Sequence, residues 1–194
     1  SHFDIRSLLD RQQYADPDGA ALAAGISCAS WPLFGMVWPS ARMLANAMQT
    51  YHINGKRILE VGCGLALASL VIHRRLGDIT ASDCHPLTEG FLRENLRLNH
   101  LPRLKYQTGH WNRENPALGR FDLIIASDVL YERNQPEVLA TFIDLHANER
   151  ANIIVLDPDR GNRTAFCRSM VARGYVSDVQ RAGVTQCTGE AYKG

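Results

Sequence analysis

The chain has 194 residues, of which 45% are hydrophobic and 21% are charged, and its formal net charge at pH 7 is +1. A chain of this length and composition is expected to fold as one domain, residues 1–194, with a sizeable core. The near-neutral charge gives no electrostatic argument for binding to nucleic acid or to an acidic membrane surface.

The five cysteines form no CxxC pair: they are Cys28, Cys63, Cys84, Cys167 and Cys187. An odd number of scattered cysteines suits a reducing compartment better than a disulfide framework or a zinc site. No apolar run approaches the ~20 residues needed to cross a bilayer, and no signal peptide opens the chain. We therefore expect a cytoplasmic protein with no metal and no membrane contact. A monomer is compatible with the sequence, which leaves the oligomeric state open.

Residues 1–37 are predicted to form a segment that covers a core made by residues 38–194. The helical spacing of apolar residues within 3–14 predicts a helix there. Residues 20–34 are apolar and rich in small side chains, which is compatible with a short extended strand or cover. Two roles remain open for the segment: packing across one sheet edge, and a partial lid over a site.

A helix is predicted from about residue 40 to residue 51 by its apolar stripe. Trp38 precedes Pro39, so its backbone is extended and leads into this helix. The helix should lie beside the first strand of the sheet. Trp38 is then either core filler or an aromatic neighbour of a bound cation, held by cation–π attraction.

The sequence RILEVGCG, residues 57–64, is the feature around which the rest is organised. The apolar run 57–61 predicts a buried strand, and the segment 64–76 predicts a helix. A strand, a tight glycine turn and a helix begin a nucleotide-type site in a doubly wound α/β sheet. A side chain at Gly62 or Gly64 would keep the backbone away from a ligand lying across the turn.

Glu60 is the next-to-last residue of this strand and is predicted to face the same crevice. A carboxylate there would repel a dinucleotide pyrophosphate but would attract a ligand with an ammonium and a sulfonium group, such as S-adenosylmethionine. The third glycine of a GxGxxG motif is absent, since Leu67 holds its place. Asp83 ends the next predicted strand, 79–83, where a carboxylate can accept both hydroxyls of a ribose.

A helix from Pro86 to about residue 100 and a strand over about 104–108 come next. Trp111 follows that strand, at the place where the adenine ring of a bound nucleoside would lie. Trp111 is therefore either an adenine neighbour or a partly buried loop residue. Cys63 is better explained as a small residue between two glycines than as a nucleophile.

Residues 121–126 form the clearest predicted strand, which leads into Ser127, Asp128 and Tyr131. This strand should lie beside the first strand on the side away from Asp83, so that Asp128 and Tyr131 face the site from there. A buried carboxylate can bind an amine and orient its lone pair, and an aromatic ring can wall the channel. The alternative is that Asp128 caps a turn and Tyr131 belongs to the core.

The remaining predicted elements are a helix at 136–146, a strand at 152–156, a helix at 162–173, a strand at 175–180 and a poor final strand at 184–192. Alternating strands and helices argue for an α/β fold, a Rossmann-like doubly wound and mainly parallel sheet with helices on both faces.

The loop after residue 156 holds Asp159 and Arg160. These residues either line the entrance of the site or form a solvated turn that caps the next helix through Asn162. We favour the solvated turn.

With these residues placed, the chain resembles the class I, seven-β-strand methyltransferases that depend on S-adenosylmethionine. Within them it resembles methyltransferase family 16, which holds many protein-lysine methyltransferases, and its N-terminal half is similar to bacterial members. The resemblance covers roughly residues 35–180. Its motifs are GMVWPSARMLA (35–45), ILEVGCGLALASL (58–70), ITASD (79–83), the helix with Asn95 and Asn99, GHW (109–111), and FDLIIASDVLYE (121–132) with a D-x-x-Y signature.

The resemblance implies seven strands in the order 3-2-1-4-5-7-6, with strand seven, the last in sequence, antiparallel. It implies S-adenosylmethionine as the cofactor and S-adenosylhomocysteine as the product. The implied cofactor-binding residues are Trp38, Glu60, Gly62, Cys63, Gly64, Asp83, Cys84, Trp111 and Ser127, and the implied catalytic residues are Asp128 and Tyr131. The family usually has an acidic residue where this chain has His110, which leaves the contact to the adenine amino group open.

The leading hypothesis is methyl transfer to a lysine amine of a protein substrate. The alternatives are a methyltransferase for a small amine or an RNA base, an inactive cofactor-binding module and a nicotinamide-dependent oxidoreductase. Val129 and Leu130 stand where methyltransferases for base amines have two prolines, which argues against a base as the acceptor. Binding of RNA would need a basic surface, and the near-neutral charge of the chain gives no sign of one. Glu60 and the missing third glycine argue against the oxidoreductase.

Overall fold

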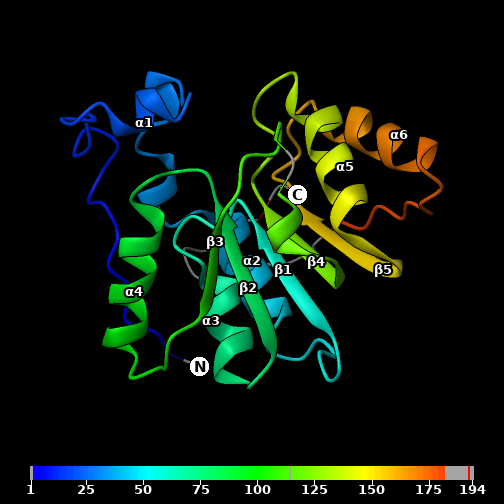
Figure 1. Ribbon diagram of the computed structural model, residues 1–194, viewed down its shortest axis with the longest axis horizontal. Helices are drawn as coiled ribbons and strands as arrows, with labels where there is room; N and C mark the ends of the chain where they lie inside the picture. Colours follow the sequence, from blue (N-terminus) through cyan, green and yellow to red (C-terminus); the bar gives the residue numbers. More distant parts are fainter. Residues whose placement is uncertain (1, 114, 182–191, 193–194) are drawn as a thin grey trace.

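The computed structural model describes residues 2–113, 115–181 and 192 of the chain. Within them, parallel strands form one sheet in the order β3-β2-β1-β4-β5 (Figure 1). The strands are β1 (Arg57–Val61), β2 (Asp78–Asp83), β3 (Lys105–Thr108), β4 (Phe121–Ser127) and β5 (Ala147–Leu156). At the end of β1, Val61 pairs with Ser82 in β2 and with Ala126 in β4, so these three strands end at the same level.

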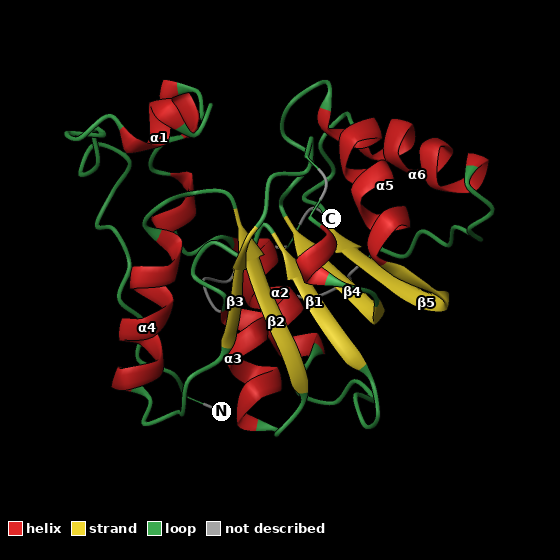
Figure 2. Ribbon diagram, in the orientation of Figure 1, coloured by secondary structure: helices red, strands yellow, loops and turns green. Residues whose placement is uncertain are grey.

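Helices cover both faces of the sheet (Figure 2). One face is packed by α2 (Pro39–Ala47), α3 (Leu67–Arg74) and α4 (Thr88–Leu98), and the other by α5 (Gln135–His146) and α6 (Arg163–Ala172). The short helix α1 (Ala20–Ala23) and two 3-10 turns, Cys28–Ser30 and Leu33–Gly35, belong to the N-terminal segment. A third 3-10 turn, Pro116–Leu118, lies between β3 and β4.

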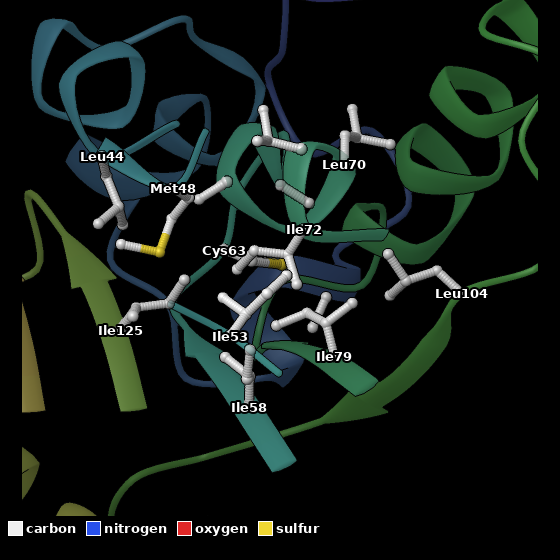
Figure 3. Packing of buried hydrophobic residues seen from close by; sticks show 14 of the residues in the cluster. Leu44, Met48, Ile53, Ile58, Cys63, Leu70, Ile72, Ile79, Leu104 and Ile125 are labelled. Atoms are coloured by element: carbon white, nitrogen blue, oxygen red, sulfur yellow. The ribbon is translucent and has the colours of Figure 1, made fainter. Parts of the chain in front are cut away.

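Side chains of the central strands alternate between the two cores, as the twofold period of a strand requires. Ile58 points into the cluster beneath α2, α3 and α4, while Leu59 points into the cluster beneath α5 and α6. Figure 3 shows the first cluster, where Ile58 and Ile125 from the sheet meet Met48 and Ile72 from the helices. The two central strands, β1 and β4, are buried on both faces, which explains why they are nearly continuous apolar runs.

The predicted helix over residues 3–14 is wrong. Residues 2–7 carry no helix and run beside α4 instead (Figure 1). The Asp4 N–H donates to Asn99 Oδ1 at 3.0 Å, and the Arg6 N–H donates to Asn95 Oδ1 at 2.7 Å. Side-chain amides of α4 therefore satisfy the backbone groups that a helix would have paired internally.

Two predictions near the C-terminus have different outcomes. The predicted strand at 175–180 is wrong, because these residues are irregular and Val176 is almost fully exposed. The predicted final strand at 184–192 lies outside the described residues except for Tyr192. The described part of the sheet confirms the order 3-2-1-4-5, and β5 begins at Ala147, earlier than the predicted residue 152.

A buried carboxylate fastens β1 to α3. Glu60 is 2% exposed, and its Oε2 accepts a hydrogen bond from the Ser69 N–H at 2.8 Å and another from the Ser69 hydroxyl. Burial raises the pKa of Glu60 to about 7, although the two bonds from Ser69 oppose that rise. The carboxylate is thus turned toward the beginning of α3.

We expect Leu70→Ala to lower the free energy of unfolding by about 2–5 kcal/mol, since Leu70 in α3 is fully buried in the core cluster shown in Figure 3. The matched control is Leu76→Ala just after the same helix, where the leucine is 93% exposed and the change should stay within about 0.5 kcal/mol. Urea unfolding measures both values. Equal losses would contradict the packing described for α3.

The Glu60 carboxyl should make stability depend on pH. Because its pKa is higher in the folded chain than in the unfolded chain, its contribution is fully present below about pH 4.5 and is lost as pH rises through 7. Between pH 5 and pH 8 the loss amounts to at most about 3 kcal/mol. Glu60→Gln, which still accepts from Ser69, should remove this part of the pH dependence.

Urea unfolding of the cofactor-free protein at pH 5 and pH 8 measures the effect. Glu94→Gln is the control, because Glu94 pairs with Arg97 on the outer side of α4 and its pKa is lowered rather than raised. Parallel stability curves for the wild type and Glu60→Gln would show that the Glu60 carboxyl does not titrate in this range.

Candidate active site

A crevice of about 590 Å³ opens at the carboxyl ends of β1, β2 and β4. Parallel strands place ligand sites at this edge, beside the strand where the sheet order reverses. The crevice is lined by all but one of the residues predicted from the sequence: Trp38, Gly62, Cys63, Gly64, Asp83, Cys84, Trp111, Ser127, Asp128 and Tyr131.

The two glycines after β1 are required by backbone conformation and by close packing. Gly62 has φ 61° and Gly64 has φ 49°, in the left-handed region that favours glycine. A Cβ on Gly62 would lie 2.8 Å from a methyl of Val129, and one on Gly64 would lie 3.0 Å from the Phe34 carbonyl oxygen. Val129 and Phe34 therefore pack against the turn, which also lines the crevice.

Asp83 joins the turn after β1 to the loop after β2. Its Oδ2 accepts the Gly64 N–H at 2.9 Å, and its Oδ1 accepts the His85 N–H at 2.8 Å. Burial raises the pKa of Asp83, and these N–H groups oppose the rise. Each oxygen keeps a second lone pair, so the carboxylate can also accept hydroxyl groups from a ligand in the crevice.

The missing residue is Glu60. The sequence predicts that its carboxylate faces the ligand, but the structure turns that group toward Ser69 in α3, and Glu60 is not among the residues that line the crevice. Glu60 is next to last in β1, as predicted, but its carboxyl points toward Ser69 at the beginning of α3.

Both tryptophans predicted from the sequence line the crevice. The Trp111 ring packs over the turn, 3.2 Å from the position a Cβ on Gly62 would take. The Trp38 ring N–H donates to the Leu33 carbonyl at 2.9 Å, and the guanidinium of Arg11 lies 5.2 Å from its ring centroid. One face of Trp38 thus already carries a cation from the N-terminal segment.

The opposite wall is formed by the segment after β4. Asp128 has φ 58°, its N–H donates to the Leu156 carbonyl at 2.8 Å, and its side chain is 7% exposed. Tyr131 is 42% exposed, and the burial of the rest of its side chain, with the negative charge of Asp83, raises the pKa of Tyr131 to about 12. The Tyr131 hydroxyl therefore keeps its proton near neutral pH and can donate a hydrogen bond.

The favoured interpretation of the loop after β5 is wrong for Arg160 and Asn162, whereas Asp159 does not line the crevice, is 44% exposed and pairs with Arg163. Arg160 lines the crevice, and its Nε donates to Asp128 Oδ1 at 2.8 Å. Asn162 does not cap α6 with its side chain; its amide donates to the carbonyls of Leu130 and Glu132, at 3.0 Å each. This loop holds the Asp128–Glu132 segment in place.

Phe34 and His85 line the crevice, and Tyr14 and Ser40 lie outside it, but none of them carries a local signal in the sequence. The Phe34 ring stacks on His85 with centroids 3.8 Å apart, and Tyr14 meets both rings edge-on. The Ser40 and Tyr192 hydroxyls lie 2.8 Å apart across the fold. The N-terminal segment packs along α4, and its residues 24–27 and 29–30 line the crevice.

In the parts of the chain that the structure describes, no group of three or more His, Cys, Asp or Glu residues is placed to hold a metal ion. None of the described helices has the length and apolar character needed to cross a membrane.

Solved structures share the fold. A ribosomal protein L11 methylase from Lactobacillus delbrueckii subsp. bulgaricus superposes with a TM-score of 0.60 at 20% identity, covering 76% of each chain. A precorrin-6y C5,15-methyltransferase from Geobacter metallireducens superposes with a TM-score of 0.57 at 16% identity, covering 70% of each chain.

Curated relatives include a calmodulin-lysine N-methyltransferase from Arabidopsis thaliana, 29% identical over 64% of this chain and 45% of its own length. A human histone-arginine methyltransferase, METTL23, is 31% identical over 60% of this chain and 66% of its own. A bovine protein-lysine methyltransferase, METTL21E, is 32% identical over 55% of this chain and 41% of its own. The chain spans about half the length of these relatives.

The profile of the lysine methyltransferase family matches residues 28–172, which include both walls of the crevice. The chain therefore belongs to the lysine methyltransferase family, a family of S-adenosylmethionine-dependent methyltransferases.

Proposed function

We propose that this protein transfers a methyl group from S-adenosylmethionine to a lysine amine of a protein substrate. The observation that carries the proposal is the opposition of two buried carboxylates in one crevice, Asp83 on one side of the glycine turn and Asp128 on the other. The names of two relatives, a calmodulin-lysine and a protein-lysine methyltransferase, support lysine as the acceptor.

The residues on the Asp83 side fit the nucleoside part of S-adenosylmethionine. Asp83 can accept ribose hydroxyls, and Trp111 and His110 border the crevice beyond it. The left-handed turn at Gly62 and Gly64 brings backbone close to the ligand, where a side chain would stand in the way. Glu60 acts indirectly, by holding the first turn of α3 behind these glycines.

The residues on the Asp128 side fit an acceptor amine. A lysine has a pKa of ~10.4 in water and must lose a proton to solvent before its lone pair can attack. Asp128 orients that nitrogen through its carboxylate, and Tyr131 walls the channel. When bound, S-adenosylmethionine supplies a methyl carbon that forms a bond to nitrogen as its bond to sulfur breaks, with the electron pair leaving on the sulfur of S-adenosylhomocysteine.

We further propose that the protein acts in the cytoplasm. All four cysteines that the structure describes are free thiols, which suits a reducing compartment. A small amine or an RNA base as acceptor remains an outcome that the labelling experiment below distinguishes.

Asp83→Asn should lower the affinity for S-adenosylhomocysteine by about 10–100-fold, because an amide cannot accept both backbone N–H groups that the carboxylate accepts. Isothermal titration measures the affinity. Asp78→Asn is the control at the other end of β2, where Asp78 pairs with Lys105 at the surface, and its affinity should change less than about twofold. Unchanged affinity in Asp83→Asn would refute the role of Asp83, and a preference of the wild type for NAD would refute the cofactor assignment.

Asp128→Asn should keep the affinity for S-adenosylhomocysteine and slow methyl transfer by about 100-fold or more, since the amine loses the carboxylate that places it. Asp159→Asn is the control, because Asp159 has φ 62°, close to that of Asp128, and asparagine tolerates this conformation at both sites.

The measurement is labelling of a host-cell lysate with S-adenosylmethionine that carries a radioactive methyl group. Mass spectrometry then identifies the modified protein and residue. A labelled small molecule or RNA in place of a protein would reject the proposed acceptor, and equal labelling by Asp128→Asn and the wild type would reject the role of Asp128.

A further inference from the structure

One of the two carboxylate oxygens of Asp128 already binds an arginine side chain. Arg160 Nε donates to Asp128 Oδ1 at 2.8 Å, and Arg160 Nη2 lies 2.7 Å from the same oxygen. Among the described residues, no donor forms a hydrogen bond to Asp128 Oδ2. The ion pair is buried on the Asp128 side, at 7% exposure, and reaches solvent on the Arg160 side, at 40%.

The arginine is held in this position by its own loop. The Arg160 N–H donates to Asp157 Oδ1 at 2.6 Å, and Asn162 ties the following residues to the Leu130 and Glu132 carbonyls. Because Arg160 also lines the crevice, its charge lies beside the place where an acceptor nitrogen would meet Asp128 Oδ2.

We propose that Arg160 is a positioning residue that selects the acceptor, reserving one oxygen of Asp128 for a neutral lysine amine and excluding an arginine side chain. The proposal rests on the proposed function, because it concerns the acceptor side of the same crevice.

Two physical effects support this selection. A positive charge next to the acceptor favours the neutral amine over the ammonium, so a larger fraction of a bound lysine can attack. A guanidinium does not deprotonate in proteins, and it binds a carboxylate best through two parallel bonds to two oxygens. With Oδ1 taken by Arg160, that pairing is closed to an acceptor arginine.

Other titratable groups face the ion pair and enter its balance of charge: Asp157 and Asp159 from the same loop, Tyr131 and Glu132 from the segment after β4, and Tyr192 near the C-terminus. Asp157 opposes the effect of Arg160 most directly, but burial raises the pKa of its carboxyl. Burial also raises the pKa of Tyr192, which stays neutral near pH 7. Among the described residues, Arg160 is the cation that forms an ion pair with Asp128.

The test compares Arg160→Gln with Arg163→Gln in the 194-residue chain. Arg163 is the matched control, because it lies three residues after Arg160, at the start of α6, and pairs with Asp159 instead of Asp128. Each variant is titrated with S-adenosylhomocysteine to show that the cofactor side is intact. Each then labels the host lysate over pH 6–10, and acid hydrolysis separates methylated lysine from methylated arginine.

The wild type and Arg163→Gln should label lysine, with methylated arginine at most a few per cent of the product. In Arg160→Gln, labelling of lysine at pH 7 should fall about tenfold, and the pH at half-maximal rate should rise by about one unit, as expected when a nearby cation is removed. The share of methylated arginine should rise at least tenfold. A uniform loss of rate, with no pH shift and no change in the modified residue, would mean that Arg160 is merely structural and would overturn the proposal.

Arg160→Lys keeps the charge and serves as the second variant in case Arg160→Gln does not fold. Its pH at half-maximal rate should equal that of the wild type, and a rise like that expected for Arg160→Gln would overturn the proposal. If the wild type binds S-adenosylhomocysteine but labels nothing, the proposed function fails and this inference fails with it. If the wild type labels lysine but Arg160→Gln behaves as Arg163→Gln, only the inference fails.

Discussion

The buried Asp83 carboxylate is the interaction on which the geometry of the site depends. A charge taken out of water must find donors, and Asp83 finds them in the N–H groups of Gly64 and His85. These two bonds fix the turn after β1 against the loop after β2. The same constraint applies between β1 and α3, where the buried Glu60 carboxyl accepts hydrogen bonds from the Ser69 N–H and hydroxyl at the beginning of α3. Two carboxylates thus set the shape of the turn before any ligand arrives.

The other wall of the crevice is fixed by bonds between two loops. The segment after β4 is tied to the end of β5 by the Asp128 N–H, and to the following loop by Asn162 and Arg160. Neither loop would hold this shape alone, since Asp128 adopts a left-handed conformation that is uncommon for a residue with a side chain. The acceptor side therefore depends on residues from two neighbouring strands, while the cofactor side depends on β1 and β2.

The central strands β1 and β4 could be predicted well, because a parallel strand that is buried on both faces is a nearly continuous apolar run. The turn residues Gly62, Gly64 and Asp83 could be predicted too, since each follows directly from a strand end. The predicted helix at 3–14 failed for a reason that no local pattern contains: Asn95 in α4 and Asn99 just after it bind the backbone of residues 4 and 6. The predicted strand at 175–180 has the right alternation, but in the structure those residues are irregular and mostly exposed.

The sequence by itself determined the order of the elements, the glycine turn and the acidic residues that end β2 and β4, because these depend on periodicity and on residues adjacent in the chain. Only the tertiary structure decided where the carboxylates point. Glu60 turns to Ser69, and Asp128 shares its charge with Arg160, a residue that the sequence assigned to a solvated turn. The reason is physical: the direction of a buried charge is set by the nearest donor in space, and that donor comes from a part of the chain that local spacing does not specify.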